Sequence, residues 1–470
     1  MQGGQPLPSP ITMSFAMPPS RLAQLGLAMR RHRGTIQAIQ WAVVCAYAVL
    51  VGVPAFLPLP PDTAHLWTNL TVFARFVFWG IWWPFVLVSM VLIGRTWCGV
   101  FCPEGTLTEF TSRYSLGRAV PRWLSWRGWP FVAFLGTTVY GQMVSVYQYP
   151  APALLILGGS TLAAMVVGLV YGRNKRVWCR YLCPVQGVFA LLAKLAPVHY
   201  RVDSLAWAQS QARRDRPGPV HCAPLVPIRT MRGAAACHMC GNCAGLRGAV
   251  DLAARRPNSE ILTQPEASGW ETALILFGLM GVAVGAFQWS ASPWFGQARV
   301  ALVAWLVDRD ILWPLAGGAP WWLLTHYPAQ GDVMTWLDGG LLLAYIAATA
   351  LGLGLAYLAL LAGGLWLAGA WSRARLHLLA QSLIPMAGCG VFLGLSAITV
   401  TLLQQDGLGL PAVALARAAL LAGAGLWSAW LGWRLAARWC AGWRRVAVAA
   451  GPACGSALAA YGWVLLFWVW

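Results

Sequence analysis

Arg95-Thr-Trp-Cys98-Gly-Val-Phe-Cys102-Pro103 and Arg176-Val-Trp-Cys179-Arg-Tyr-Leu-Cys183-Pro184 are two copies of one pattern, 81 residues apart. Each copy follows an apolar run of membrane length, and together the copies supply four cysteines in two Cys-x3-Cys-Pro pairs. The repeated unit is therefore a helix, a short turn, a second helix and a cysteine pair. Parallel repeats related by an axis along the membrane normal would bring the two pairs together at one membrane edge.

The composition is that of a membrane protein. Of the 470 residues, 59% are hydrophobic and 10% are charged, whereas charged residues make up about 25% of a soluble domain. A helix that crosses a bilayer needs about 20 apolar residues. We therefore predict an all-α polytopic membrane protein. Nine spans are expected, at residues 35–57, 76–93, 129–147, 153–171, 270–290, 341–370, 378–403, 411–432 and 446–468.

The basic residues predict the orientation of these spans. The chain has a formal net charge of +19, and its arginines gather in alternate loops. Several precede the first span, none lies in 58–71, and several follow the second span. By the positive-inside rule the N-terminus is cytoplasmic and the C-terminus lies outside. Because the charge follows the membrane topology, we expect membrane lipid as a partner and no nucleic acid.

Four regions follow from this pattern. Residues 1–34 form a cytoplasmic N-terminal segment, and 35–200 form a four-helix membrane domain that carries both cysteine pairs. Residues 201–269 are the long polar stretch, and 270–470 form a C-terminal membrane domain of four to five helices. All cysteine motifs then share the cytoplasmic side, where thiols stay reduced and are available to metals.

The proline after each pair suggests a local structure for the second cysteine. Proline disfavours helical geometry in the residue before it and suits the first turn of a helix. We therefore expect Cys102 and Cys183 to be the N-caps of helices at 105–116 and 186–196. The positive end of each helix would lower the pKa of the thiol and favour metal ligation.

The pairs alone leave several chemistries open. Iron–sulfur ligation is favoured, but zinc sites also use cysteines spaced two to four apart, and a thiol redox pair or simple packing stay open. Arg95 and Arg176 would add positive charge near an anionic site. Trp97 and Trp178, at span ends, are interpreted as ordinary interfacial residues.

A third cysteine cluster, Cys237-His-Met-Cys240-Gly-Asn-Cys243, lies in the polar stretch and has the spacing of a bacterial ferredoxin site. The usual fourth cysteine is replaced by Arg247. Cys222 is the other cysteine of the polar stretch and is the expected fourth ligand. A three-cysteine site with an exchangeable position, or a thiolate borrowed from a Cys-Pro pair, are the alternatives. His221 and His238 are less favoured ligands.

With these motifs the chain resembles the polyferredoxin membrane proteins of the NapH, NosR and CcoG type, over about residues 35–265. The resemblance implies electron transfer between a quinone pool or cytoplasmic donors and reductases, or support of oxidase and copper-site assembly. It departs from the family pattern because a second ferredoxin motif is absent and the fourth ligand is displaced. The implied redox motif at the membrane edge comprises Cys98, Cys102, Cys179 and Cys183. The implied ferredoxin-type ligands are Cys237, Cys240 and Cys243.

These observations favour a membrane-bound electron-transfer protein over a stand-alone enzyme. We expect one [4Fe-4S] cluster in the cytoplasmic segment and a second iron–sulfur or other redox centre at the paired cysteines. Redox proteins are the expected partners, with a quinone as a further candidate, and the cell (inner) membrane is the expected location. The alternatives are an assembly or metal-reducing factor that uses the same centres, and a transporter or scaffold with structural zinc.

The remaining 270–470 region carries no assigned chemistry. Cys45 in the first span and Cys389, Cys440 and Cys454 in the C-terminal region lie singly in or beside apolar runs, which is typical of packing. The stretch Ala298–Val307 is expected to lie in the outer membrane interface.

Overall fold

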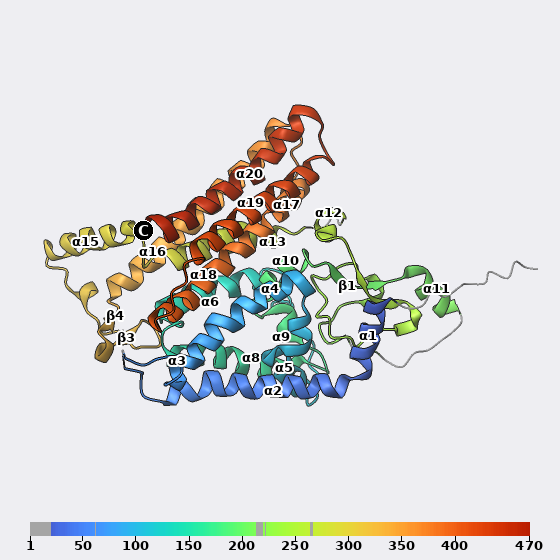
Figure 1. Cartoon of the computed structure of the whole chain (residues 1–470), viewed down its shortest axis with the longest axis horizontal. Coiled ribbons are helices and arrows are strands. Elements are labelled where there is room, and N and C mark those ends of the chain that lie inside the picture. The colour runs from blue at the N-terminus through green and yellow to red at the C-terminus, as the bar shows by residue number, and fades with distance from the viewer. Residues whose placement is uncertain (1–19, 62, 213–219, 221, 264–266) are drawn as a thin grey trace, which may run out of the picture.

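The computed structural model describes residues 20–61, 63–212, 220, 222–263 and 267–470. The molecule is mostly helical, with two small two-stranded sheets. Figure 1 shows a bundle of long helices with α1 (Arg21–Arg31), β1 (Val198–Val202) and α11 (Ser204–Ala212) together at one end. At the other end lie α15 (Pro293–Val307) and the short strands β3 (His326–Tyr327) and β4 (Asp332–Val333).

Within the described residues, eight helical stretches are long and apolar enough to cross a membrane. They are Arg33–Phe56, Leu70–Ile93, Pro150–Tyr171, Gly269–Gln288, Trp336–Leu367, Arg373–Gln405, Val413–Ala436 and Gly442–Val469. The remaining predicted span, 129–147, contains α6 (Trp129–Met143), whose 15 residues extend about 22 Å at 1.5 Å per residue. This length is below the roughly 30 Å of a bilayer core. The predicted total of nine spans therefore stays a prediction.

The N-terminal membrane half contains both repeats. In each repeat the second span includes a short π-helical stretch, η2 (Phe76–Trp82) in the first and η4 (Leu154–Gly158) in the second. The other elements are α2 (Arg33–Gly52), η1 (Val53–Phe56), α3 (Leu70–Arg75), α4 (Trp83–Ile93), η3 (Trp97–Phe101), α5 (Pro103–Ser112), α7 (Pro150–Ala153), α8 (Gly159–Tyr171), α9 (Val177–Tyr181) and α10 (Gln186–Ala193). A π turn widens the helix locally and is frequent at functional sites.

The polar segment is built on one antiparallel strand pair. β1 pairs with β2 (Val250–Ala254), with Val198 opposite Ala254 and Val202 opposite Val250. Around this pair Tyr200, Met231 and Val250 form a small apolar core that also includes Cys237. Helix α1 lies against the sheet, since a Cβ at Gly26 would be 3.1 Å from Leu252 Cβ. The short elements η5 (Ile228–Thr230), η6 (Leu246–Gly248) and α12 (Ser259–Thr263) complete the segment.

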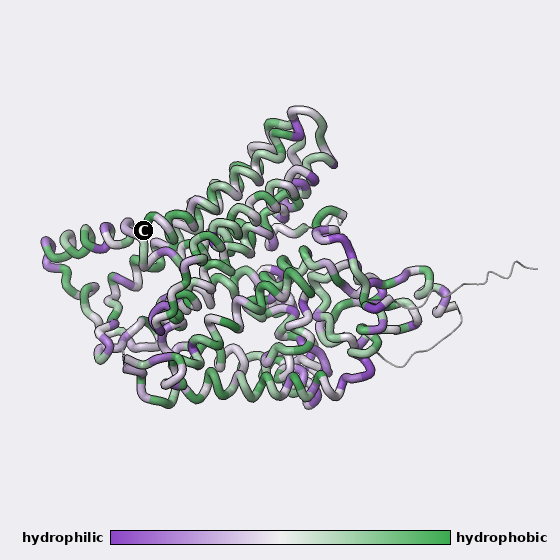
Figure 2. Tube along the Cα trace, in the orientation of Figure 1, coloured by the Kyte–Doolittle hydropathy of each residue, from purple (hydrophilic) through white to green (hydrophobic). Residues whose placement is uncertain are grey.

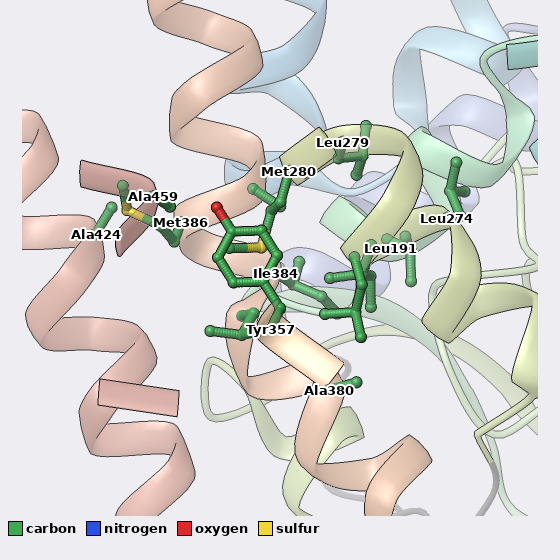
Figure 3. Close-up of a cluster of buried hydrophobic side chains, with 14 of the residues drawn as sticks. Leu191, Leu274, Leu279, Met280, Tyr357, Ala380, Ile384, Met386, Ala424 and Ala459 are labelled. Carbon is green, nitrogen blue, oxygen red and sulfur yellow. The ribbon is translucent and has the colours of Figure 1, made fainter. Parts of the chain in front are cut away.

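The C-terminal half packs directly on the first half. Its helices are α13 (Gly269–Ala273), η7 (Leu274–Val282), α14 (Ala283–Gln288), α15, α16 (Trp336–Leu367), α17 (Arg373–Ala380), η10 (Gln381–Leu383), α18 (Ile384–Gln405), α19 (Val413–Ala436), α20 (Gly442–Val464) and η11 (Leu465–Val469). η8 (Trp313–Leu315) and η9 (Pro328–Gln330) lie in the connection between α15 and α16. Figure 3 shows Leu191 of α10 beside Leu274, Tyr357 and Ile384 from the C-terminal half. One apolar core therefore continues across the predicted boundary at residue 270.

Hydropathy follows the same arrangement. In Figure 2 hydrophobic residues run along the long helices, while hydrophilic residues gather around α1, the β1–β2 segment and the helix ends. The helix α15 includes Ala298–Val307, the stretch expected in the outer interface, and lies at the end of the molecule away from β1. Arg299 of α15 is held by Asp338 at the start of α16, with Nε 2.5 Å from Oδ1.

Candidate metal centres

The paired cysteines of the two repeats come together. Cys98, Cys102, Cys179 and Cys183 all line one cavity of about 220 Å³. In each copy the second cysteine closes the same six-residue turn. The Cys102 N–H donates to the Trp97 carbonyl at 3.0 Å, and the Cys183 N–H donates to the Trp178 carbonyl at 3.1 Å. The repeat predicted this meeting of the pairs.

The two cysteine-proline junctions differ in how the next helix begins. Cys102 is the N-cap of α5, and its Sγ accepts the Gly105 N–H at 3.4 Å, as predicted. The corresponding prediction for Cys183 is wrong, because α10 begins at Gln186 with Val185 as its N-cap. Pro184 and Val185 form an intervening turn, closed by the Gln186 N–H on the Cys183 carbonyl at 3.1 Å.

The predicted lowering of the thiol pKa is also wrong. Burial raises the pKa of Cys102 and Cys183 well above the usual range, and it raises the pKa of Cys179 to about 12. Desolvation outweighs the helix terminus, and the neighbouring thiols add repulsion between negative charges. A metal would have to supply the positive charge that keeps these thiols deprotonated.

The two repeat arginines are buried cations beside this site. Arg95 and Arg176 are each 2% exposed. Arg176 forms a salt bridge with Glu109, with Nη2 2.7 Å from Oε2, and donates to the Cys98 carbonyl. Both guanidinium groups lie close enough to stabilise a charged Cys179 thiolate. The expected positive charge is therefore present.

Glu104 is a site residue that the sequence analysis missed. It follows Cys102-Pro103, lines the cavity, and accepts hydrogen bonds from Ser160 Oγ at 2.6 Å and Trp178 Nε1 at 3.1 Å. Burial raises its pKa. Trp178 is 9% exposed, so its interpretation as an interfacial residue is wrong. A carboxylate in the first turn after a Cys-Pro motif was the available signal.

The cysteines of the polar segment form a second group. Cys237 is buried, whereas Cys240, Cys243 and Cys222 are partly exposed. Negative charge on Cys240 and Cys222 raises the pKa of both Cys237 and Cys243, in addition to the larger effect of burial. Cys222 therefore lies near the ferredoxin-spaced cysteines, although 15 residues separate it from Cys237 in the sequence.

Arg247 occupies the sequence position of the usual fourth ferredoxin ligand, and its side chain contacts α11 instead of the cysteines. Arg247 donates from Nη1 to Ser210 Oγ at 3.2 Å, and its guanidinium lies 5.4 Å from the centre of the Trp207 ring. Arg247 has a positive φ of 56° in a tight turn. This residue has a structural role in the contact between η6 and α11.

A buried ion pair holds the loop that leads to Cys237. Arg255 and Glu260 are 2.6 Å apart, and their side chains are 7% and 5% exposed. Glu260 accepts the Ala234 N–H at 2.8 Å. Arg255 also donates to the carbonyls of Ala193 and Ala196 at the end of α10. The pair thus connects the cysteine loop to the second repeat.

Of the two less favoured histidine ligands, His221 lies outside the described residues. His238 is 2% exposed and lines the same cavity as the paired cysteines. Its Nδ1 has no hydrogen-bond partner among the described residues. A residue of the ferredoxin-like loop therefore reaches the site of the repeats.

The cysteine groups supply the kind of donor that an iron–sulfur cluster uses. In the part of the chain that the structure describes, no three His, Cys, Asp or Glu side chains converge closely enough to hold one metal ion. In a [4Fe-4S] site each thiolate binds a different iron. Four cysteines line the cavity of the repeats and four lie in the polar segment, which is the number that such a cluster requires.

Comparison with protein families identifies the class of domain. Residues 76–129 and 154–202 match the 4Fe-4S binding domain family. The chain therefore carries a 4Fe-4S binding domain in two segments. Each segment contains the second span of one repeat and its cysteine pair, whereas the cluster at 237–243 lies outside the match.

The chain is also similar to an Escherichia coli (strain K12) protein named "Putative electron transport protein YccM". The two are 24% identical over 227 residues, which is 43% of this chain and 62% of the relative. The chain thus spans less than two thirds of the length of this curated relative. No solved structure matches the chain.

Proposed function

We propose that this chain is a membrane-bound iron–sulfur protein that passes electrons between a quinone pool or cytoplasmic donor and a redox partner. One observation carries the proposal. The two segments that match a 4Fe-4S binding domain fold so that their four paired cysteines line a single cavity. Similarity to a protein named for electron transport supports the same conclusion.

Two groups of residues would hold the clusters. Cys98, Cys102, Cys179 and Cys183 would hold one at the membrane edge, and Cys222, Cys237, Cys240 and Cys243 would hold one in the polar segment. Such a cluster accepts and donates single electrons at a potential set by its hydrogen bonds, charge and exposure. Here Arg95 and Arg176 contribute buried positive charge, which favours the reduced state of the nearby site.

The cavity at the membrane edge supports a lipid-soluble carrier as one partner. Beyond the cysteines it continues between apolar and aromatic side chains, which include Tyr47, Trp79 and Phe287. The π-helical stretches η2 and η4 both contribute to its wall. Trp83 and Arg95 also line this region, and neither Trp83 Nε1 nor Arg95 Nε has a hydrogen-bond partner among the described residues.

Three alternative functions agree less well with these observations or are not distinguished by them. An assembly or metal-reducing factor would use the same two centres and differs only in what receives the electron. A structural zinc site agrees less well with the 4Fe-4S match. A thiol redox pair likewise agrees less well with the 4Fe-4S match.

The proposal is tested by iron and sulfide analysis with EPR of the anaerobically purified protein. We expect about four iron atoms and four sulfides per occupied site. Cys98→Ser and Cys179→Ser should each remove the same EPR signal, and the double variant should lose little more, because the pairs share one centre. Cys389→Ser, in α18, is the control and should keep the signal. Stoichiometric zinc without iron, or separate additive losses, would contradict the shared iron–sulfur site.

We also propose that the polar segment faces the cytoplasm and that the chain resides in the inner membrane. The arginine distribution supports this orientation. An odd number of crossings is supported by the placement of α1 and the C-terminus, because α1 lies beside β1 and α11 while the C-terminus lies at the end of the bundle away from them.

A further inference from the structure

We infer that the repeat cysteines and the ferredoxin-like cysteines form one electron-transfer pair, in which Gly99 brings the two sites into direct backbone contact. This inference rests on the proposed function, because it requires a metal centre at both sites. Gly99 lies between Cys98 and Cys102. A Cβ added there would be 2.1 Å from the His238 carbonyl oxygen and 2.9 Å from Cys240 Cα. No side chain fits in this space, so the two loops touch through their main chains.

The arginine that opens each copy of the repeat fixes one end of the loop between Cys222 and Cys237. Arg95 donates from Nη1 to the Ala235 carbonyl at 2.8 Å, two residues before Cys237. The Arg176 backbone N–H donates to the Ala223 carbonyl at 2.8 Å, directly after Cys222. The two equivalent positions of the repeat thus hold the loop at both ends. At position 95 the contact uses the arginine side chain, and at position 176 it uses the backbone.

The Arg176 guanidinium adjoins both groups. Its side chain donates to the Cys98 carbonyl of one group, and its backbone N–H donates to the Ala223 carbonyl beside Cys222 of the other. His238, which lies between two ferredoxin-like cysteines, lines the cavity of the repeat cysteines. One buried cation and one imidazole therefore adjoin both sites, and no separate element lies between Gly99 and Cys240.

The inferred step is a one-electron transfer. An electron leaves the reduced site of the polar segment, which is oxidised, and enters the site at the membrane edge, which is reduced. No bond or proton changes in this step. A one-electron donor on the polar side then reduces the first site again; dithionite takes this role in the test below.

The experiment uses the full-length protein with both sites loaded, fully reduced by dithionite under anaerobic conditions. Two paramagnetic centres in such close contact should broaden or split each other's EPR signals and relax faster than isolated clusters. Gly99→Ala should push the loops apart, so this interaction, measured per bound cluster, should weaken or disappear. Gly136→Ala is the matched control, because a Cβ at Gly136 in α6 meets nothing within 4 Å. It should leave the interaction intact.

The wild-type spectrum decides the inference even if Gly99→Ala binds less iron. Two fully reduced clusters that show no magnetic interaction would overturn it. An interaction that persists unchanged in Gly99→Ala would overturn the role of Gly99. Iron at only one of the two sites would overturn the paired arrangement and leave electron transfer by a single centre, whereas a protein without iron would overturn the proposed function itself.

Discussion

His199 makes the stability of the polar segment dependent on pH. It lies in β1 opposite Ala253, and burial lowers its pKa from 6.5 to about 4, with a further contribution from the positive charge of Arg255. Arg201 acts in the same direction, and Glu260 opposes both. The native state therefore holds a neutral imidazole, while the unfolded chain takes up a proton near pH 6.5.

We expect the stability of this segment to be complete above pH 6.5 and to fall as the pH is lowered toward 4. His199→Gln should flatten this part of the profile, since its side chain does not titrate. Thermal unfolding of the purified protein, followed between pH 7.5 and 4 for both forms, measures the difference. Parallel curves for the wild type and the variant would contradict the assignment to His199.

Cys222 is the second single residue on which a prediction depends. It is close to Cys240 and Cys243, so it is placed to complete the ferredoxin-like site. Cys222→Ser replaces a thiolate with an oxygen donor and should lower iron occupancy or shift the EPR signal of that cluster. Thr230→Ser, in the same loop, is the control and should do neither. Unchanged iron and an unchanged spectrum in Cys222→Ser would leave an exchangeable position or a borrowed thiolate as the fourth ligand.

At the scale of elements, the Arg255–Glu260 pair connects α10, α12 and the loop before Cys237. Glu260→Ala would leave the Arg255 charge buried without its partner and free the Ala234 N–H. Loss of one partner of a buried pair destabilises by about 3 to 5 kcal/mol. We expect faster proteolysis of the polar segment and loss of iron from its cluster, while the cluster of the repeat cysteines is affected less. Asp308→Asn, at an exposed position after α15, is the control. Equal proteolysis rates for the two variants would contradict this role.

The elements also show what the sequence could and could not predict. Apolar runs of about 20 residues predicted the long helices, because a bilayer imposes that length. The 81-residue offset predicted that Cys98 and Cys179 would lie near each other, because parallel repeats place equivalent residues at one end. The ferredoxin-like cysteines were indicated by their spacing in the sequence, because the ligands of such a site lie two residues apart along the chain.

The unpredicted features depend on contacts between distant parts of the chain. Nothing near Glu104 in the sequence shows that Ser160 and Trp178 will bind its carboxylate. The close approach of Gly99 to His238 is equally invisible, because a glycine in a loop has many uses. The pKa of Cys183 was predicted in the wrong direction because a local helix-terminus argument omits the cost of burial, which only the folded molecule sets.

At the scale of the whole molecule, one continuous core joins the two halves. Leu191 and Ile275 belong to the same buried cluster as Leu383 and Trp463. The C-terminal helices therefore support the wall of the cavity, to which Val391 and Leu395 of α18 contribute directly. A chain that ends before α16 would expose this core, so the repeats are not expected to keep their geometry without the C-terminal half.

The orientation in the membrane gives the last prediction. A reporter fused after Arg118, or within 205–220, should report the cytoplasm, because these positions lie on the arginine-rich side. A reporter fused after Trp470 should report the outer compartment, as should one after Asp310, between α15 and α16.

The short helix α6 decides the result, since its 15 residues must cross for the number of spans to be odd. If α6 crosses by local thinning of the bilayer, as short spans do, the two ends of the chain face opposite sides. A cytoplasmic signal from the terminal fusion would mean an even number of crossings, and the prediction of nine spans would be wrong.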